Sequence, residues 1–255
     1  PLFVAPIALV LAKICRSNSI LHIQDFEVDA AFELGMLKGS HLRSLLLLLE
    51  SVLMRSFDVV STISVSMLSR AKVKKVDSKK LLFFPNWVDV SVFNIENSDE
   101  EKFVYRKRFG IPCNSIVALY SGNMGAKQGL ESLAELAEMC NSNLESSLFY
   151  FVFCGDGIGK DMLVERTKNL INVKFLDLQP AYLLPKFFNM IDIHLLPQRA
   201  DIADLVMPSK LTGMLASGRP VLAQAKAGTE IATVLNGLGV VVAPGNAKEL
   251  FDGFA

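Results

Sequence analysis

The chain has 255 residues, of which 51% are hydrophobic and 20% are charged. This composition excludes an intrinsically disordered protein and supplies enough apolar residues for two domains of ordinary size. Lys and Arg number 26, as do Asp and Glu, so the formal net charge is zero, which argues against broad nucleic-acid binding because that needs a basic face. The four cysteines are widely spaced without a CxxC pair, which favours reduced thiols in a cytoplasmic protein.

The two ends of the chain resemble interrupted elements. The first residue is proline rather than methionine, and residues 249–255 read as a helix cut short. We therefore expect an internal piece of a longer protein. The apolar run at residues 2–12 is too short to cross a bilayer, since that takes about 20 residues.

Short apolar runs alternate with helical patterns along the whole chain. Strands are predicted at residues 19–23, 59–63, 81–84, 116–120, 148–154, 173–176, 193–196, 221–223 and 240–242. Helices are predicted at residues 42–57, 130–140, 160–168, 182–190, 209–216 and 229–235. Strands that lack internal alternation and are separated by helices indicate parallel sheets covered on both faces.

The most polar stretch of the chain is NIENSDEEK at residues 94–102. Its composition suits a linker or the start of a surface helix. We therefore place a domain boundary near Asn94, which predicts one domain over residues 1–94 and a second over residues 95–255. Both are expected to be Rossmann-like, the first incomplete at its start and the second truncated at its end.

A predicted helix at residues 42–57 carries more apolar residues than one stripe can hold. They are Leu42, Leu45, Leu46, Leu48, Leu49, Val52, Leu53 and Phe57. Burial between a sheet and neighbouring helices explains this pattern and is the favoured interpretation. The alternative is a surface that meets the membrane interface.

The strand at residues 116–120 runs into a glycine-rich loop, YSGNMGAKQG, and a helical pattern follows at once. The exposed N–H groups of such a turn and the positive end of the next helix favour an anion. Lys127 adds a full positive charge at the same place. The loop therefore predicts a phosphate site that includes Gly122, Asn123, Gly125 and Lys127.

Several motifs resemble those of family 4 glycosyltransferases and occur in the order of that family. They are DVVSTIS at residues 58–64, FPNWVD at 84–89, SGNMGAKQG at 121–129, FCGDG at 153–157, PSK at 208–210 and ASGRPV at 216–221. HIQD at residues 22–25, together with GNMG.KQG and PSK, resembles the branch of bacterial exopolysaccharide clusters of the colanic-acid type.

The resemblance implies a GT-B fold, in which two Rossmann-like domains face each other across a cleft. The nucleotide sugar would lie on the second domain and the acceptor on the first, in keeping with ligands at the carboxyl ends of parallel strands. The implied activity is that of a retaining glycosyltransferase in cell-surface polysaccharide assembly. It would move a hexose-type sugar from a nucleotide diphosphate to a lipid-linked acceptor at the inner face of the cytoplasmic membrane.

Such a transfer passes through an oxocarbenium-like transition state while negative charge grows on the leaving phosphate. A fixed positive field at that phosphate is therefore the useful catalytic device, and Lys127 is its predicted source. The triplet Asp25-Phe26-Glu27 superficially resembles a DxD metal site, but two carboxylates alone do not define one. The resemblance implies neither a metal nor a cofactor.

The sequence departs from the family pattern on the donor side. Asn123 stands where the family usually has an arginine, and Lys210 is the candidate to replace that charge, with Arg199 as a weaker one. An ordinary surface lysine at a helix start is an equal alternative for Lys210. The resemblance places Ser209 beside it in the donor-site helix.

Two family glutamates are also missing. The second of them falls on Gly213, and the first falls near Asp204 or Leu205. Asp204 remains a candidate to reach the sugar, against the alternative of a plain loop carboxylate. Glu230 is placed to contact a ribose or a sugar, although an acidic residue in a first helical turn also stabilises the helix by itself.

On the first domain, Asp25 follows the strand that ends near residue 23. It is predicted to orient the acceptor hydroxyl or take its proton, with His22 and Glu27 on the acceptor side as well. In a retaining enzyme the leaving phosphate is the alternative proton acceptor. A histidine whose hydrogen bonds are satisfied at a strand end is the more ordinary interpretation of His22.

Three other functions were weighed. The glycine spacing in residues 122–129 does not fit the GxGxxG fingerprint, which argues against a nicotinamide- or flavin-dependent oxidoreductase. A sugar-nucleotide epimerase on the same GT-B frame is a nearer alternative, but it needs more acid and base residues around the sugar. A non-catalytic partner subunit is the third, motivated by Gly213.

Overall fold

The computed structural model describes residues 4–93, 99–125, 128–142 and 148–253. The chain divides into two compact units, Pro1–Asn86 with Asp201–Pro208 and Trp87–Ala200 with Ser209–Ala255. The first unit thus ends eight residues before the boundary expected at residue 94, and it includes a short segment from late in the sequence. Residues 99–102 of the polar stretch begin a helix, Asp99–Phe109, in agreement with its interpretation as the start of a surface helix, and residues 94–98 lie outside the described residues.

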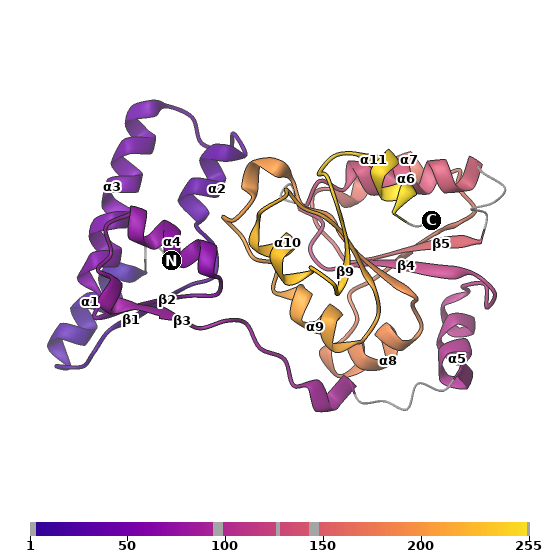
Figure 1. Ribbon diagram of the computed structural model, residues 1–255, viewed down its shortest axis with the longest axis horizontal. Coiled ribbons are helices and arrows are strands. Elements are labelled where there is room, and N and C mark those ends of the chain that lie inside the picture. Colours follow the sequence, from indigo (N-terminus) through magenta and orange to yellow (C-terminus); the bar gives the residue numbers. More distant parts are fainter. Residues whose placement is uncertain (1–3, 94–98, 126–127, 143–147, 254–255) are drawn as a thin grey trace. The chain divides into compact units, whose positions relative to one another are not determined.

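The first unit contains a three-stranded parallel sheet and four helices (Figure 1). The strands are β1 (Ile20–Ile23), β2 (Val59–Thr62) and β3 (Leu81–Phe83), hydrogen-bonded in that order. The helices are α1 (Ala5–Ile14), α2 (Glu27–Glu33), α3 (Ser40–Ser56) and α4 (Val65–Val73), with a 3-10 turn at Ser78–Lys80.

Helices α1, α3 and α4 of the first unit pack on one face of its sheet. Ile23 and Val60 of the sheet join Met54 of α3 and Met67 of α4 in one buried apolar cluster. On the other face the side chains of Ile20, Leu82 and Phe84 are about half exposed or more. The prediction of a sheet covered on both faces is therefore wrong for this unit as far as the chain is described, because α1, α3 and α4 all contribute to the same cluster.

Helix α3 exposes most of its leucines. Leu42, Leu45, Leu48, Leu49 and Val52 are between 42% and 58% exposed, and Met54 is the helical residue that is fully buried. The favoured interpretation of α3 as a core helix is thus wrong for that side of the helix. In the described parts of the chain, no helix has both the length and the apolarity that crossing a membrane requires.

The second unit contains a six-stranded parallel sheet in the order β6-β5-β4-β7-β8-β9 (Figure 1). Its strands are β4 (Ile116–Ser121), β5 (Phe149–Cys154), β6 (Val173–Leu176), β7 (Ile193–Leu196), β8 (Val221–Gln224) and β9 (Gly239–Val242). Numbered within the unit, this is the order 3-2-1-4-5-6 of a Rossmann fold.

Helices cover both faces of this sheet, as the sequence predicts. They are α5 (Asp99–Phe109), α6 (Glu131–Ser142), α7 (Lys160–Thr167), α8 (Leu184–Asn189), α9 (Lys210–Ala216), α10 (Glu230–Val234) and α11 (Ala247–Asp252). The described residues also form 3-10 turns at Val90–Phe93, Ala181–Leu183 and Ala200–Ile202. Tyr120 points into the cluster on the α6 face, whereas Leu119 points into the cluster on the α8 face.

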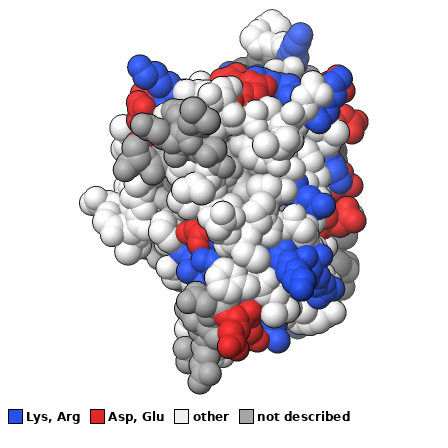
Figure 2. Space-filling view, turned by 90° about the vertical axis from the view of Figure 1, so that its right-hand side faces the viewer, with Lys and Arg blue, Asp and Glu red and all other residues white. Residues whose placement is uncertain are grey.

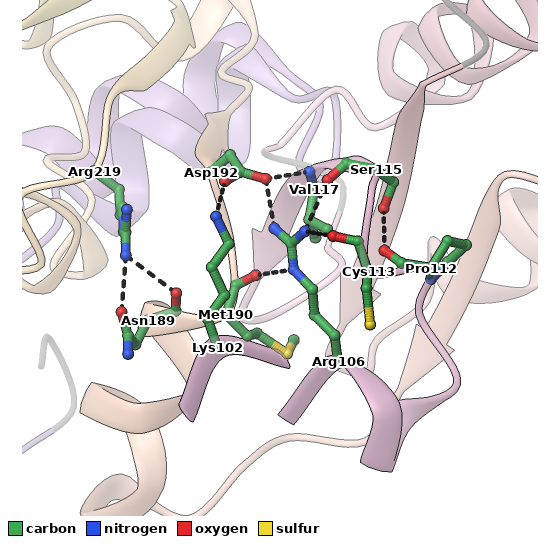
Figure 3. A network of polar contacts seen from close by, with 10 residues as sticks. All are labelled: Lys102, Arg106, Pro112, Cys113, Ser115, Val117, Asn189, Met190, Asp192 and Arg219. Carbon is green, nitrogen blue, oxygen red and sulfur yellow. Dashed lines mark hydrogen bonds and ion pairs between the residues drawn. The ribbon is translucent and has the colours of Figure 1, made fainter. Parts of the chain in front are cut away.

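A buried arginine fastens α5 to the second sheet (Figure 3). Arg106 donates hydrogen bonds to the carbonyl oxygens of Met190 (2.8 Å), Cys113 (3.0 Å) and Ser115 (2.8 Å) and to the carboxylate of Asp192 (2.6 Å). Asp192 also accepts from Lys102 and from the N–H of Val117. The network therefore holds the amino ends of β4 and β7 beside each other.

The surface of the molecule carries charges of both signs. Figure 2 shows the side that lies at the right of Figure 1, where basic and acidic residues are interspersed around a broad uncharged centre. This distribution agrees with the formal net charge of zero.

Candidate functional site

The carboxyl ends of β4 and β7 mark the place where the second sheet reverses its strand order. The chain leaves β4 toward β5 on one side, and it leaves β7 toward β8 on the other. In open parallel sheets ligands bind at this switch point, beyond the carboxyl ends of the strands. The phosphate loop predicted from the sequence begins there, directly after β4.

Backbone hydrogen bonds tie the loop after β4 to the loop after β5. The N–H of Met124 donates to the carbonyl of Asp156 (2.7 Å), and the carbonyl of Met124 accepts from Gly159 (2.8 Å). The phenol of Tyr120 donates to the carbonyl of Asn123 (2.6 Å). These hydrogen bonds therefore fix the conformation of the start of the loop.

Two glycines make this close approach feasible. A Cβ on Gly155 would lie 2.0 Å from the carbonyl oxygen of Gly122, and one on Gly157 would lie 2.7 Å from that of Met124. The backbone of Gly122 itself has φ of +126°, a value that residues with a side chain rarely adopt. The Gly-Asp-Gly motif thus serves the backbone of the phosphate loop, and the carboxylate of Asp156 accepts from the N–H of Gly157.

The rest of the predicted loop is only partly described. Lys127 lies outside the described residues, so its part in the site stays a prediction. Asn123 is exposed, and its side-chain nitrogen lies 3.1 Å from the position of a Cβ on Gly125. At the far end of the loop, the Cγ of Arg199 lies 3.1 Å from the corresponding position on Gly129.

Lys210 lies at the switch point. Its Nζ is 4.0 Å from the centre of the Tyr120 ring, and its Cδ is 3.6 Å from the position of a Cβ on Gly122. Burial lowers the pKa of Lys210 to about 7. The structure therefore brings Lys210 to the start of the predicted phosphate loop.

Two more predicted donor-side residues follow neighbouring strands of the same sheet. Ser209 is the exposed residue before α9, and its carbonyl accepts from the hydroxyl of Thr212. Glu230 begins α10, directly after Thr229, whose backbone is extended.

Gly213 is the position at which the family has its second glutamate. A Cβ at Gly213 would lie 3.7 Å from the ring of Phe188 and 4.0 Å from that of Phe93, so this position faces an aromatic pair.

Asp204 is placed apart from these residues. It belongs to the segment Asp201–Pro208 of the first unit, has φ of +59°, and lines a groove there with Arg70 and Lys74. The structure thus groups Asp204 with the acceptor-side unit and not with the loop after β4. Its proposed contact with the sugar stays a prediction.

On the acceptor side, the structure separates His22 from the two carboxylates. The Nδ1 of His22 is 2.9 Å from the hydroxyl of Ser61, its Nε2 is 2.6 Å from the amide of Gln24, and its ring meets Phe84 edge-on. Asp25 and Glu27 instead line a cavity of about 40 Å³ together with Glu50.

The backbone of Asp25 pairs with a distant segment of the chain, and sequence analysis did not predict this pairing. Asp25 and Val206 form an antiparallel bridge, and the N–H of Phe26 donates to the carbonyl of Leu205 (3.2 Å). Leu205 is buried. A segment from between β7 and α9 is therefore fixed beside the candidate acceptor residue, and no local motif indicates this pairing.

The ring of Tyr120 is a second feature that sequence reasoning missed. A large aromatic residue at the end of a strand was available as a signal, but its neighbour Lys210 is 90 residues away. Among the described residues, no group of three or more His, Cys, Asp or Glu side chains is arranged to hold a metal ion.

Comparison with known proteins decides the family. Residues 101–255 match the family described as Glycosyl transferases group 1. The chain belongs to this family. The match covers the whole of the Rossmann-like sheet described above, including the loop after β4 and Lys210.

A relative in Escherichia coli strain K12 bears the name colanic acid biosynthesis glycosyl transferase WcaI. It is 37% identical over 260 aligned residues, which cover 99% of this chain and 63% of the relative. The chain therefore spans less than two thirds of the length of that relative. The resemblance to the colanic-acid branch of the family is confirmed.

Solved structures confirm the fold class. HepE of Anabaena, in complex with UDP and glucose, has a TM-score of 0.77 at 17% identity, over 99% of this chain and 65% of HepE. A glycosyltransferase of Rickettsia africae has a TM-score of 0.68 at 16% identity, over 99% of this chain and 69% of the other. The predicted GT-B class, with two Rossmann-like parallel-sheet domains, is correct.

Proposed function

We propose that the protein is a glycosyltransferase that moves a sugar from a nucleotide diphosphate to a glycan acceptor in cell-surface polysaccharide biosynthesis. The observation that carries this proposal is the glycine loop at the switch point of the family-defining sheet, joined there by the amine of Lys210. The name of the Escherichia coli relative supports the polysaccharide, and the UDP and glucose bound to HepE support the donor class.

The proposed reaction breaks the bond between the anomeric carbon and a donor phosphate oxygen. A new bond joins that carbon to the acceptor hydroxyl with retention of configuration. Negative charge that develops on the departing diphosphate is met by the N–H groups around Gly122 and Gly125, by Lys210 and by Lys127. The proton of the acceptor hydroxyl passes either to the leaving phosphate or to Asp25.

On the donor side, Ser209 and Glu230 are proposed to contact the nucleotide sugar. They follow β7 and β8, and ligands in this fold lie beyond the carboxyl ends of such strands. On the acceptor side, Asp25 and Glu27 are proposed to position the acceptor, since both line one small cavity. Neither a metal nor a cofactor is proposed to take part.

A lipid-linked acceptor and peripheral contact with the inner face of the cytoplasmic membrane belong to the same proposal. Helix α3 exposes five apolar side chains in the described structure, and the partly or fully exposed Arg43 and Arg55 flank them. An apolar helix face bordered by cations is suited to an anionic membrane surface.

The double variant Leu45→Asp with Leu48→Asp tests this contact. It should reduce sedimentation of the full-length protein with anionic vesicles at least tenfold. Ile171→Asp, at an exposed apolar residue of the second unit, should not.

The central test is nucleotide binding by the full-length protein. Thermal unfolding in the presence of UDP, GDP and their sugars should show a higher melting temperature for one base, because a ligand that binds only the native state stabilises it. Lys127→Ala should then lower kcat/KM by about 100-fold, equivalent to about 3 kcal/mol, whereas Lys168→Ala on the remote helix end should not.

The outcomes separate the alternatives. A folded protein that binds no nucleotide overturns the proposal and favours the non-catalytic partner that Gly213 motivates. Conversion of one free nucleotide sugar to another without any acceptor overturns it in favour of the epimerase. Transfer of sugar to a lipid-linked acceptor supports it.

A further inference from the structure

We propose that Lys210 changes its charge when the donor binds: its amine is mainly uncharged in the empty site at pH 8 and takes up a proton as the nucleoside diphosphate arrives. The inference rests on the proposed function, since it assigns to Lys210 the recognition of that diphosphate. It goes further in making the positive charge of the site a product of ligand binding.

The position of the amine carries the inference. Lys210 reaches from the first residue of α9 to the end of β4, where its Nζ lies 4.0 Å from the centre of the Tyr120 ring. Its methylene chain packs against Gly122, with Cδ 3.6 Å from the position of a Cβ there. Within the described chain it makes no ion pair, so an aromatic face is the group that interacts with its charge.

Three titratable residues near Lys210, namely Tyr120, His194 and Arg219, carry no negative charge at neutral pH. From β4, Tyr120 keeps its proton, because burial raises the pKa of its phenol and the hydroxyl donates to Asn123. From β7, His194 is buried, and burial followed by the charges of Arg219 and Lys210 lowers its pKa to about 3. From the turn after α9, Arg219 adds a positive charge, and its guanidinium donates a hydrogen bond to the side-chain oxygen of Asn189.

The face of the Tyr120 ring favours the ammonium form, but removal of the amine from water outweighs that contact. Removal from water opposes a charged amine, and the imidazole of His194 is neutral at pH 7. Burial accordingly lowers the pKa of Lys210 to about 7, several units below the usual value for lysine. At pH 8 the uncharged form of the amine therefore predominates.

A bound diphosphate reverses this balance. Opposite charge beside an amine favours its protonated form, so the pKa of Lys210 rises on binding. Protons are then taken up at pH values between the free and the bound pKa. As pH rises through that window the affinity falls, by up to tenfold for each pH unit, whereas below pH 7 this group adds no further pH dependence.

The experiment is titration calorimetry of the full-length protein with UDP and with GDP at pH 8.0. The measurement is repeated in buffers of different ionisation enthalpy, so that the number of protons exchanged follows from the slope. At this pH a terminal phosphate with a pKa near 6 is already deprotonated and contributes little. The wild-type protein should take up most of one proton for each nucleotide bound.

Variants locate that proton. Lys210→Arg should bind without proton uptake because arginine stays charged, and its affinity should be level between pH 7 and pH 9. Lys210→Met should bind at least tenfold more weakly at pH 7, also without uptake. Lys127→Arg should keep the uptake, as should the remote control Lys168→Met. Circular dichroism of each variant confirms that it is folded.

Two failures are distinguishable. If the wild-type protein binds UDP or GDP without proton uptake, or if Lys210→Arg still takes up a proton, the inference is overturned and the proposed function stands. If no nucleoside diphosphate binds to the folded wild-type protein, the proposed function falls and the inference falls with it.

Discussion

The two units bury charge in different ways. In the second unit, Arg106 meets three backbone carbonyls and one carboxylate, and the strands and turns of the fold place all four. In the first unit, the ammonium of Lys74 lies between the carboxylates of Asp29 and Glu50, and Arg70 pairs with Asp29 at 2.5 Å. These partners are side chains from α2, α3 and the region of α4.

The difference shows which part of each unit is held in place by its buried ions. Because backbone carbonyls cannot rearrange without moving the sheet, Arg106 is tied to the strands whose carboxyl ends form the candidate donor site. The first-unit cluster instead joins helices to each other, and its members can be exchanged more independently. Five predictions test this comparison, and they run from the largest expected effect to the smallest.

Arg106→Met should be the most destabilising change. It leaves the carbonyls of Met190, Cys113 and Ser115 without this donor and removes one partner of Asp192, and breaking the ion pair of a buried arginine in this way costs about 3–5 kcal/mol. Urea denaturation of the full chain measures the free energy of unfolding. Arg166→Met, at an exposed ion pair with Glu138, is the control and should cost less than about 1 kcal/mol. Equal losses for the two variants would contradict the role given to Arg106.

Gly155→Ala should cost about 3 kcal/mol and abolish nucleotide binding. Its Cβ would lie 2.0 Å from a backbone oxygen of Gly122, so the loops after β4 and β5 must separate. Gly218→Ala is matched to it, because Gly218 also has positive φ but no atom within 4 Å of a Cβ. That variant should lose about 1 kcal/mol and keep its nucleotide affinity. Unchanged binding by folded Gly155→Ala would show that the loop tolerates the separation.

Asp29→Asn and Glu50→Gln should have opposite effects within the first-unit cluster. Burial acts to raise the pKa of Asp29, but hydrogen bonds from Lys74 and Arg70 outweigh it and hold the pKa below its usual range. Burial dominates at Glu50 and raises its pKa. Asp29→Asn should therefore cost about 2 kcal/mol at pH 7, whereas Glu50→Gln should be neutral or slightly stabilising.

The pH dependence of stability separates the same two carboxylates. The contribution of Asp29 is present above its unfolded-state pKa of about 4 and is lost as pH falls through the lowered folded value. That of Glu50 is present below its unfolded-state pKa of about 4.3 and is lost as pH rises through the raised folded value. The free energy of unfolding should be measured by denaturation from pH 3 to pH 8. The loss of stability on lowering the pH should vanish in Asp29→Asn, and the loss of stability on raising the pH should vanish in Glu50→Gln. Identical profiles for both variants would refute the assignment.

The smallest effects are expected from one helix cap in each unit. The hydroxyl of Ser64 accepts from the N–H of Met67 at the start of α4, and the amide of Asn246 accepts from the N–H of Glu249 at the start of α11. Replacing either by Ala should cost about 1 kcal/mol. Calorimetric unfolding should show the loss in the transition of the unit that holds the cap. A shift of both transitions by one variant would mean that the two units unfold together.

Local physics explains what the sequence determined by itself. The strand that becomes β6 and the strand that becomes β7 were predicted to the residue, because uninterrupted apolar runs between turns need a buried strand. The glycines after β4 predicted a phosphate site, which stays a prediction, and the structure adds that Gly155 and Gly157 let the loops after β4 and β5 approach closely. The order of motifs identified the family, which the comparison confirms.

Tertiary structure alone decided the rest. Helices α1, α2 and α4 were not predicted, and nothing local to Arg106 shows that it would be buried among carbonyls far along the chain. The bridge from Asp25 to Val206 and the contact of Lys210 with Tyr120 join residues 181 and 90 positions apart. Apolar periodicity and glycine conformation act over a few residues, so the sequence displays them. The burial of a charge depends on which distant segments surround it, and only the folded chain brings those segments together.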